Sequence, residues 1–88
     1  MKIKQGFIKR KIQDKYVVVA TGDASKTYRN FIELNQTASV IWDEVKNGKT
    51  IEQIAELFVK EYGITIEKAT QDINKIVSVL IKEGIICE

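Results

Sequence analysis

The sequence predicts an α+β fold, in which a three-stranded antiparallel sheet is followed by three helices. Two observations indicate this order. Short runs of β-branched and aromatic residues, separated by polar turns, precede Asn35. From Asn35 onward, apolar residues recur at intervals of three and four, which is the spacing of an amphipathic helix. The length of 88 residues and the hydrophobic content of 44% are typical of a single small domain, residues 1–88.

The three strands are expected at Phe7–Ile12, Tyr16–Ala20 and Phe31–Leu34. A short polar turn separates the first two strands, so we expect them to form a hairpin. The run Y-V-V-V-A of the second strand is β-branched and apolar, which is the strongest strand signal in the chain. Residues Thr21–Asn30 are polar and contain one glycine, so they are predicted to form a loop.

The first helix is expected to begin at Asn35, whose side-chain oxygen can accept a hydrogen bond from a free amide of the first turn. Asn47 and Gly48 are typical of a helix end. The inward face of this helix follows the spacing i, i+3, i+4, i+7 and consists of Ala38, Ile41, Trp42 and Val45. We interpret Trp42 as a core residue at the junction of sheet and helices.

Thr50 and Gln53 form a capping-box pattern that starts the second helix, and Gly63 ends it. Thr65 is expected to cap the third helix, which runs to about Glu83 before Gly84. The inward residues of the second helix are expected to be Ile51, Ile54, Ala55, Phe58 and Tyr62. The core face of the third helix is expected to consist of Ile66, Ala69, Ile73, Ile76, Val77, Leu80 and Ile81.

The composition argues against catalysis. The chain contains no histidine and one cysteine, Cys87, so it lacks the residues of a Cys-His or Ser-His-Asp site and of an ordinary zinc site. A domain of this size also has little room for an enclosed substrate cavity. We therefore expect no catalytic residues, no cofactor and no metal, and interpret Cys87 as a free thiol.

The charge balance does not indicate that the protein binds a nucleic acid. The formal net charge is only +2, although six basic residues and one acid lie between Lys2 and Lys15. The N-terminal stretch lacks the apolar core of a signal peptide, and no apolar run is long enough to cross a membrane. We therefore expect a cytoplasmic protein with neither a membrane nor a nucleic acid as partner.

The outer side of the third helix is open to two interpretations. Lys68, Lys75 and Lys82 recur every seven residues and therefore lie along one line of the helix. This face is either a solvated charged surface or the rim of a binding site, where lysines would attract acidic side chains. In the second interpretation, Ile76 and Val79 provide an apolar strip.

The third strand raises the same question. The last strand of a meander lies at a sheet edge, and an open edge beside a helix can accept an extended peptide as a further strand. Alternation sends Ile32 and Leu34 to one face of this strand and Phe31 and Glu33 to the other. Coverage of the edge by the N-terminal segment or by a second subunit is the alternative.

Three segments together resemble the PqqD family. They are L-N-Q-T-A-S-V-I-W from Leu34, T-I-E-Q-I-A-E-L-F-V-K-E-Y-G-I from Thr50 and D-I-N-K-I-V-S-V-L-I-K-E-G-I-I from Asp72. The first is the most specific, because the family pattern is a strand ending in Leu-Asn-Glu-Thr-Ala/Gly, followed after two residues by Ile-Trp. Gln36 replaces the common glutamate. The likeness covers roughly residues 16–86.

The resemblance implies a winged-helix-like fold and a role as a non-catalytic peptide chaperone for ribosomally made, post-translationally modified peptides. In that family, the leader part of a precursor peptide becomes a fourth strand beside the third strand and the third helix. The complex is presented to a modifying enzyme, often a radical S-adenosylmethionine protein. Carried over to this chain, the implied peptide-binding residues are Phe31, Ile32, Glu33, Leu34, Lys68, Gln71, Asp72, Lys75, Ile76 and Val79.

A winged-helix DNA-binding protein is the alternative from another class of protein. Three helices beside a small sheet would fit such a protein, and its third helix would enter the major groove. Glu67 and Asp72 on the third helix argue against it, as does the scarcity of arginine, which occurs only at Arg10 and Arg29. A module that dimerises through the strand edge is a third interpretation.

Overall fold

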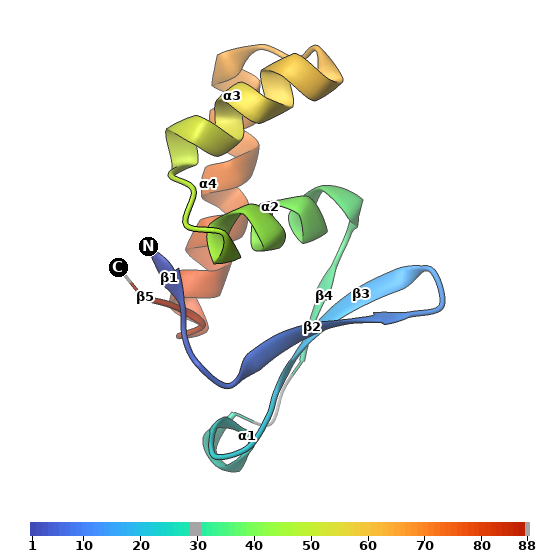
Figure 1. The fold of residues 1–88 in the computed structure, drawn as a ribbon, viewed down its shortest axis with the longest axis vertical. Coiled ribbons are helices and arrows are strands. Elements are labelled where there is room, and N and C mark those ends of the chain that lie inside the picture. The colour runs from blue at the N-terminus through green and yellow to red at the C-terminus, as the bar shows by residue number, and fades with distance from the viewer. Residues whose placement is uncertain (29–30, 88) are drawn as a thin grey trace.

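A three-stranded antiparallel sheet forms one part of the molecule and three helices form the other, which confirms the predicted α+β fold (Figure 1). The computed structural model describes residues 1–28 and 31–87. The sheet has the order β2-β3-β4, so β4 lies at an edge. The main elements are β2 (Phe7–Ile12), β3 (Lys15–Ala20), β4 (Ile32–Leu34), α2 (Gln36–Lys46), α3 (Ile51–Tyr62) and α4 (Ile66–Lys82).

Two features of the fold were not predicted. A short helix, α1 (Ala24–Thr27), lies within the segment expected to be a loop, of which residues 29 and 30 are outside the described part of the chain. The strands β1 (Lys2–Ile3) and β5 (Ile86–Cys87) pair with each other and bring the two chain ends together (Figure 1). Two-residue strands are too short to produce a periodic pattern, so only a contact distant in sequence reveals them.

The predicted helix ends are confirmed by their hydrogen bonds. The Asn35 side-chain oxygen accepts from the Ala38 N–H at 2.8 Å, and Thr50 and Gln53 form both bonds of a capping box. After α4, the Ile85 N–H donates to the Leu80 carbonyl at 2.9 Å, as in a Schellman motif. These local bonds fix where each helix starts and stops, and therefore the direction in which the next element leaves.

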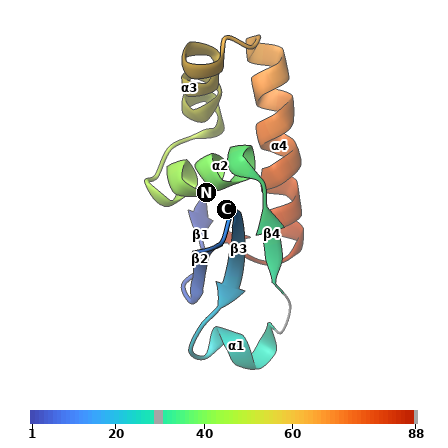
Figure 2. The same ribbon diagram turned by 90° about the vertical axis from the view of Figure 1, so that its right-hand side faces the viewer.

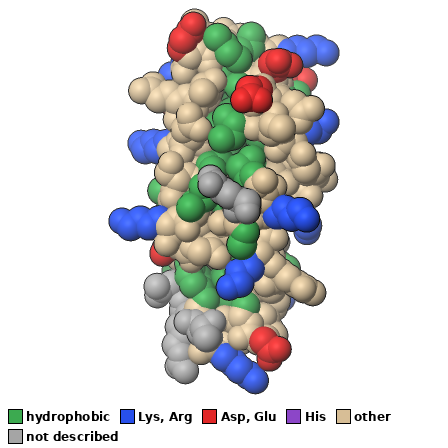
Figure 3. Space-filling view, turned by 90° about the vertical axis from the view of Figure 1, so that its left-hand side faces the viewer, with side chains coloured by type: hydrophobic (Ala, Val, Ile, Leu, Met, Phe, Trp, Pro, Cys, Tyr) green, Lys and Arg blue, Asp and Glu red, His purple; other side chains and the backbone are tan. Residues whose placement is uncertain are grey.

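The core lies between the sheet and the helices and is centred on large, fully buried side chains such as Trp42, Phe58 and Ile73. Three residues predicted to point inward are instead substantially exposed: Tyr62 by 54%, Ile66 by 44% and Ile81 by 37%. They lie at the margins or ends of their helices, where an apolar stripe extends beyond the neighbour that covers its centre. Hydrophobic side chains reach the surface as a narrow band flanked by lysine and arginine in Figure 3.

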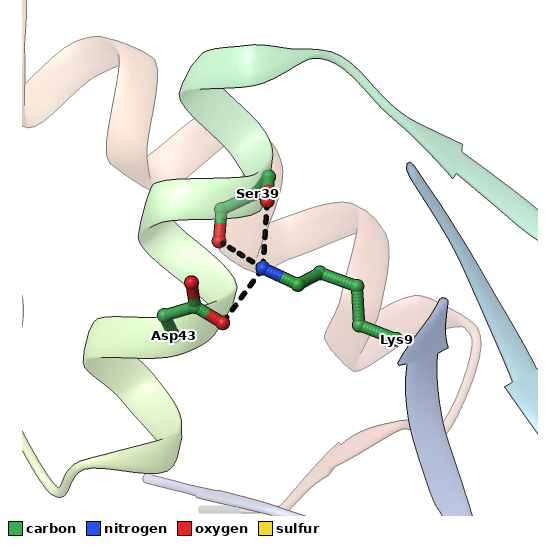
Figure 4. A network of polar contacts seen from close by, with 3 residues as sticks. All are labelled: Lys9, Ser39 and Asp43. Carbon is green, nitrogen blue, oxygen red and sulfur yellow. Dashed lines mark hydrogen bonds and ion pairs between the residues drawn. The ribbon is translucent and has the colours of Figure 1, made fainter. Parts of the chain in front are cut away.

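A polar cluster joins the sheet to α2. The Lys9 ammonium on β2 donates to Ser39 Oγ and to Asp43 Oδ1, each at 2.7 Å, and lies 3.3 Å from the Ser39 carbonyl oxygen (Figure 4). Only 16% of the Lys9 side chain is exposed, and Ser39 is buried. The ammonium also lies 5.0 Å from the centre of the Tyr16 ring, which is a cation–π distance. This cluster ties the hairpin to the helix that directly follows β4.

Candidate functional site

The pairing of β2 with β3 shows which way the backbone of each strand points. Ile12 and Lys15 are partners across a two-residue turn, and such flanking partners exchange backbone hydrogen bonds. Hydrogen-bonded pairs recur at every second residue along such a hairpin. At its other end, the Thr21 N–H donates to the Gly6 carbonyl at 2.6 Å, as this spacing requires. The odd-numbered residues of β3 therefore point their backbone groups toward β2, and the even-numbered residues point theirs toward β4.

This alternation determines the free edge of β4. Tyr16 is paired with Leu34 and Val18 with Ile32, so the backbone groups of these two β4 residues point inward to β3. Glu33, which lies opposite Val17, points its N–H and C=O outward. No strand in the described part of the chain pairs with this outer edge. The edge thus offers one donor and one acceptor at Glu33 to an added strand.

The side chains of β4 alternate as predicted. Leu34 is 4% exposed and Ile32 is half-buried against the core, whereas Glu33 is exposed on the opposite face. The Glu33 carboxylate lies 3.5 Å from the Lys15 ammonium, and both groups are largely exposed, so this ion pair is weak. Phe31 precedes β4 instead of belonging to it and is 66% exposed.

Helix α4 is long enough to have two different surroundings. Its N-terminal half lies at the level of α3, and its C-terminal half lies at the level of the sheet (Figures 1 and 2). Lys75, Ile76 and Val79 belong to the half nearer the sheet. Lys68 and Gln71 belong to the other half, where they help to line a shallow depression on the helix surface. The predicted site residues therefore do not form one compact group.

The lysines along the outer side of α4 differ in whether an acidic side chain lies beside them. The Lys68 ammonium lies 3.1 Å from the Asp72 carboxylate one turn later, so the two charges largely neutralise each other. Lys75 is exposed and makes no ion pair with any residue of 1–28 or 31–87. Next to it, Ile76 is half-buried against the core and Val79 is 47% exposed. The half of α4 nearer the sheet thus combines an unpaired cation with accessible apolar surface.

One titratable group has a perturbed environment, and it lies away from β4. Burial raises the pKa of Tyr28 above its ordinary value of 10, and the nearby Glu83 charge adds to the effect. The Tyr28 ring packs edge-on against Phe7, with ring centres 5.2 Å apart. Its hydroxyl is buried without a hydrogen-bond partner among the residues that the structure describes. We interpret Tyr28 as a structural residue that covers one end of the sheet.

Neither a metal-binding cluster nor a membrane-spanning helix occurs in the described part of the chain. Within residues 1–28 and 31–87, no three cysteine or carboxylate side chains gather closely enough to hold a metal ion. None of the helices in these ranges is both long and apolar enough to pass through a membrane.

The fold is similar to that of two solved structures. One is TbiB1 in complex with the TbiA(beta) leader peptide, with 21% identity, a TM-score of 0.78 and coverage of 97% of this chain and 93% of that chain. The other is a lasso peptide synthetase B1 complexed with the leader peptide, with 18% identity, a TM-score of 0.81 and coverage of 99% and 96%. These identities show a shared fold and no more. No protein with a curated function matches the chain significantly.

The sequence itself provides the family assignment. The family model of coenzyme PQQ synthesis protein D (PqqD) matches residues 15–86, which include the sheet from β3 onward and all three main helices. This range agrees with the resemblance read from the Leu34 to Trp42 segment and the two helical segments that follow it. The chain therefore belongs to the PqqD family.

Proposed function

We propose that this domain binds the leader region of a ribosomally synthesised precursor peptide by strand addition to the outer edge of β4. It then delivers the peptide to a modifying enzyme, for which a radical S-adenosylmethionine enzyme is our first candidate. The observation that carries the proposal is the outward-pointing backbone of Glu33 on an edge strand that has no described neighbour. Membership of the PqqD family supports it, as do two similar folds solved with leader peptides.

In this proposal the β4 edge binds the guest backbone, and α4 binds the guest side chains. The N–H and C=O of Glu33 pair with the guest backbone, which gives affinity with little dependence on the guest sequence. Each such hydrogen bond contributes only about 1 kcal/mol net, so the backbone alone binds weakly. Guest side chains on the helix-facing side meet Ile76 and Val79, and a guest carboxylate there meets Lys75. Apolar and charge contacts to α4 therefore provide most of the selectivity.

The other predicted contact residues are also part of the proposal, but they would contribute to peptide binding in different ways. Ile32 and Leu34 contribute through the packing of β4, and Phe31 extends the edge at its N-terminal end. Lys68, Gln71 and Asp72 lie nearer α3, so a guest reaches them only if it continues along α4 beyond the sheet. No residue in this mechanism performs a chemical step, because binding and presentation require none.

A proline scan tests the proposal. Proline removes the backbone donor and places its ring where the guest strand would lie, so it is tolerated only where an edge amide points outward. Glu33→Pro is expected to keep the fold and to weaken leader binding at least tenfold. Ile32→Pro is expected to destabilise the sheet, because the Ile32 amide points toward β3. The probes are fluorescent synthetic peptides, first with the TbiA(beta) leader sequence of the similar complex and then with leader sequences from short reading frames near this chain's gene, measured by anisotropy.

The matched control is Lys11→Pro on the opposite edge of the sheet. The amide of Lys11 also points outward, because the even-numbered residues of β2 exchange the hydrogen bonds with β3. This variant is expected to bind the leader like the unaltered protein. Circular dichroism confirms that each variant is folded. Undiminished binding by a folded Glu33→Pro variant would rule out strand addition at β4.

A further inference from the structure

The face of the sheet that points away from the helices carries both apolar and charged side chains. Val18 is fully buried toward the core, so its neighbours Val17 and Val19 point to the opposite side. We call this side the outer sheet face. Its members, from the register of the three strands, are Ile8, Arg10, Ile12, Lys15, Val17, Val19 and Glu33.

Part of this apolar surface is accessible. Ile12 is 55% exposed, Ile8 and Val19 are half-buried, and Val17 at the centre is 9% exposed. Phe31, which directly precedes β4, is 66% exposed. Helices α2, α3 and α4 all lie to one side of the sheet, and in the described ranges no element crosses its other side (Figures 1 and 2). Helix α1 does not cover it either, because Ala24 and the adjacent Tyr28 pack toward the core. A small domain that exposes such a face has a candidate interaction surface.

The charges of this face are arranged in a row across the strands. Arg10 on β2 is the partner of Val17 on β3, and Val17 is in turn the partner of Glu33 on β4. The row therefore runs from a cation through an apolar centre to an anion. Arg10 makes no ion pair with another described residue, whereas Glu33 has only the exposed Lys15 at 3.5 Å.

Such a row is complementary to itself. A twofold axis parallel to β3 places β2 of one copy opposite β4 of the other, because the rotation exchanges the two sheet edges. Arg10 of each copy then lies opposite Glu33 of the other copy, and the two Val17 side chains meet at the axis. The neighbouring row consists of Ile8 and Val19, and the same rotation places Val19 of one copy opposite Val19 of the other. An isologous contact requires this kind of self-complementarity.

We propose that two copies of this chain associate face to face through the outer sheet face, with Arg10 of each copy paired with Glu33 of the other. Two packed sheets lie about 10 Å apart with their strands about 30° from alignment, a geometry that this face permits. The second copy stacks on the face of the sheet, whereas a guest strand joins its edge. Both contacts involve Glu33, but the guest strand uses its backbone N–H and C=O and the second copy uses its carboxylate, so association in the absence of peptide tests the dimer alone.

The dimer is expected to be weak. Three strands at a spacing of about 4.8 Å and about 20 Å in length cover roughly 300 Å² in plan. A standard stable interface buries about 800 Å² per partner, so this contact is well below that size. Lys15 of both copies also lies near the axis, which opposes association. Monomer and dimer are therefore expected to exchange, with the dimer favoured only at high protein concentration.

Sedimentation velocity from micromolar to millimolar concentration tests the proposal. The unaltered protein is expected to shift from one toward two chains as the concentration rises. Arg10→Glu alone and Glu33→Arg alone are each expected to weaken association at least tenfold, because each homodimer would contain two like-charge contacts. An equimolar mixture of the two variants is expected to associate again, because every charge at positions 10 and 33 then faces its opposite.

The control is Lys11→Glu, which changes the net charge as Arg10→Glu does but on the helix-facing side of β2. It is expected to associate like the unaltered protein. A chain that stays monomeric throughout the concentration range would overturn the proposal. So would a mixture that associates no better than its two components, or a control variant that loses association as strongly as Arg10→Glu.

Discussion

Replacement of Lys9 by methionine tests how much the polar cluster between β2 and α2 contributes to stability. Methionine keeps most of the aliphatic length of lysine, so the packing of the stem is largely preserved and the ammonium is removed. Three oxygen atoms lose their donor: Ser39 Oγ and Asp43 Oδ1, each at 2.7 Å, and the Ser39 carbonyl at 3.3 Å. Of these, loss of the bond to Ser39 Oγ is the most destabilising, because Ser39 is 5% exposed, whereas its carbonyl oxygen keeps the intrahelical hydrogen bond of α2.

The expected loss follows from these environments. A hydrogen bond to a charged group contributes about 1.5–3 kcal/mol when it is shielded from water. The Asp43 side chain is 55% exposed, so its share is nearer to that of a surface ion pair, below about 1 kcal/mol. In the unaltered protein, folding also removes the Lys9 ammonium from water, which costs free energy. The methionine variant avoids this cost, so part of the loss is offset. We therefore expect Lys9→Met to lower the free energy of unfolding by about 1–3 kcal/mol in total.

Thermal unfolding measures this difference. A change of 1 kcal/mol shifts the Tm of a domain of this size by about 4–8 °C, so the variant should melt roughly 5–20 °C lower. Trp42 is the only tryptophan and is 1% exposed, so its fluorescence reports exposure of the core. Urea unfolding at two salt concentrations separates the exposed Asp43 contribution, which salt screens, from the shielded Ser39 contribution.

Lys11→Met is the matched control. Lys11 lies on the same strand and face and near the same Tyr16 ring, at 5.7 Å, but no hydrogen bond to α2 involves it among the described contacts. Its replacement should change the stability by less than about 0.5 kcal/mol. Equal stability of the two variants would refute the reasoning, because it would show that the bonds to α2 contribute nothing beyond removal of one charge.

Three further predictions concern other parts of the molecule. Gly84 has φ of +76° and open space around it, so Gly84→Ala should cost about 1–2 kcal/mol through backbone strain alone, measured by urea unfolding; an unchanged midpoint would contradict this. The raised pKa of Tyr28 means that the folded state favours the neutral phenol, so stability should fall as the pH rises above 10. Tyr28→Phe should reduce that fall, and an identical pH profile would remove Tyr28 as its source. Val79→Glu should weaken leader binding severalfold without lowering the Tm, and unaltered affinity would exclude Val79 from the site.

Much of the fold could be predicted because the signals are local. A cap such as Asn35 or Thr50 needs only the amides of the next turn, so the sequence around it is sufficient. Alternation along β4 is equally local, and the burial of Leu34 beside the exposure of Glu33 agrees with it. The pairing of β1 with β5 could not be predicted in this way, because it depends on two chain ends that lie far apart in sequence.

The predicted surface of α4 illustrates a different limit. Periodicity identified one wide apolar stripe, but it could not indicate how far the neighbouring elements would cover that stripe. Ile66 and Ile81 proved to be partly exposed at its margin. Likewise, the regular spacing of the lysines did not reveal that Lys68 would be neutralised by Asp72 whereas Lys75 would remain unpaired with the described residues. Coverage and pairing depend on neighbours that helical spacing does not specify.

The sequence by itself determined the order of the three sheet strands β2, β3 and β4 and of the three main helices, the helix ends and the family, because each depends on residues that are close along the chain. Only the tertiary structure decided that no described strand covers the predicted edge of β4, that the backbone of Glu33 points outward and that the C-terminal half of α4 lies at the level of the sheet. These features depend on strand register and on the packing of helices against the sheet. Both arise from contacts between segments distant in sequence, and no local pattern encodes them.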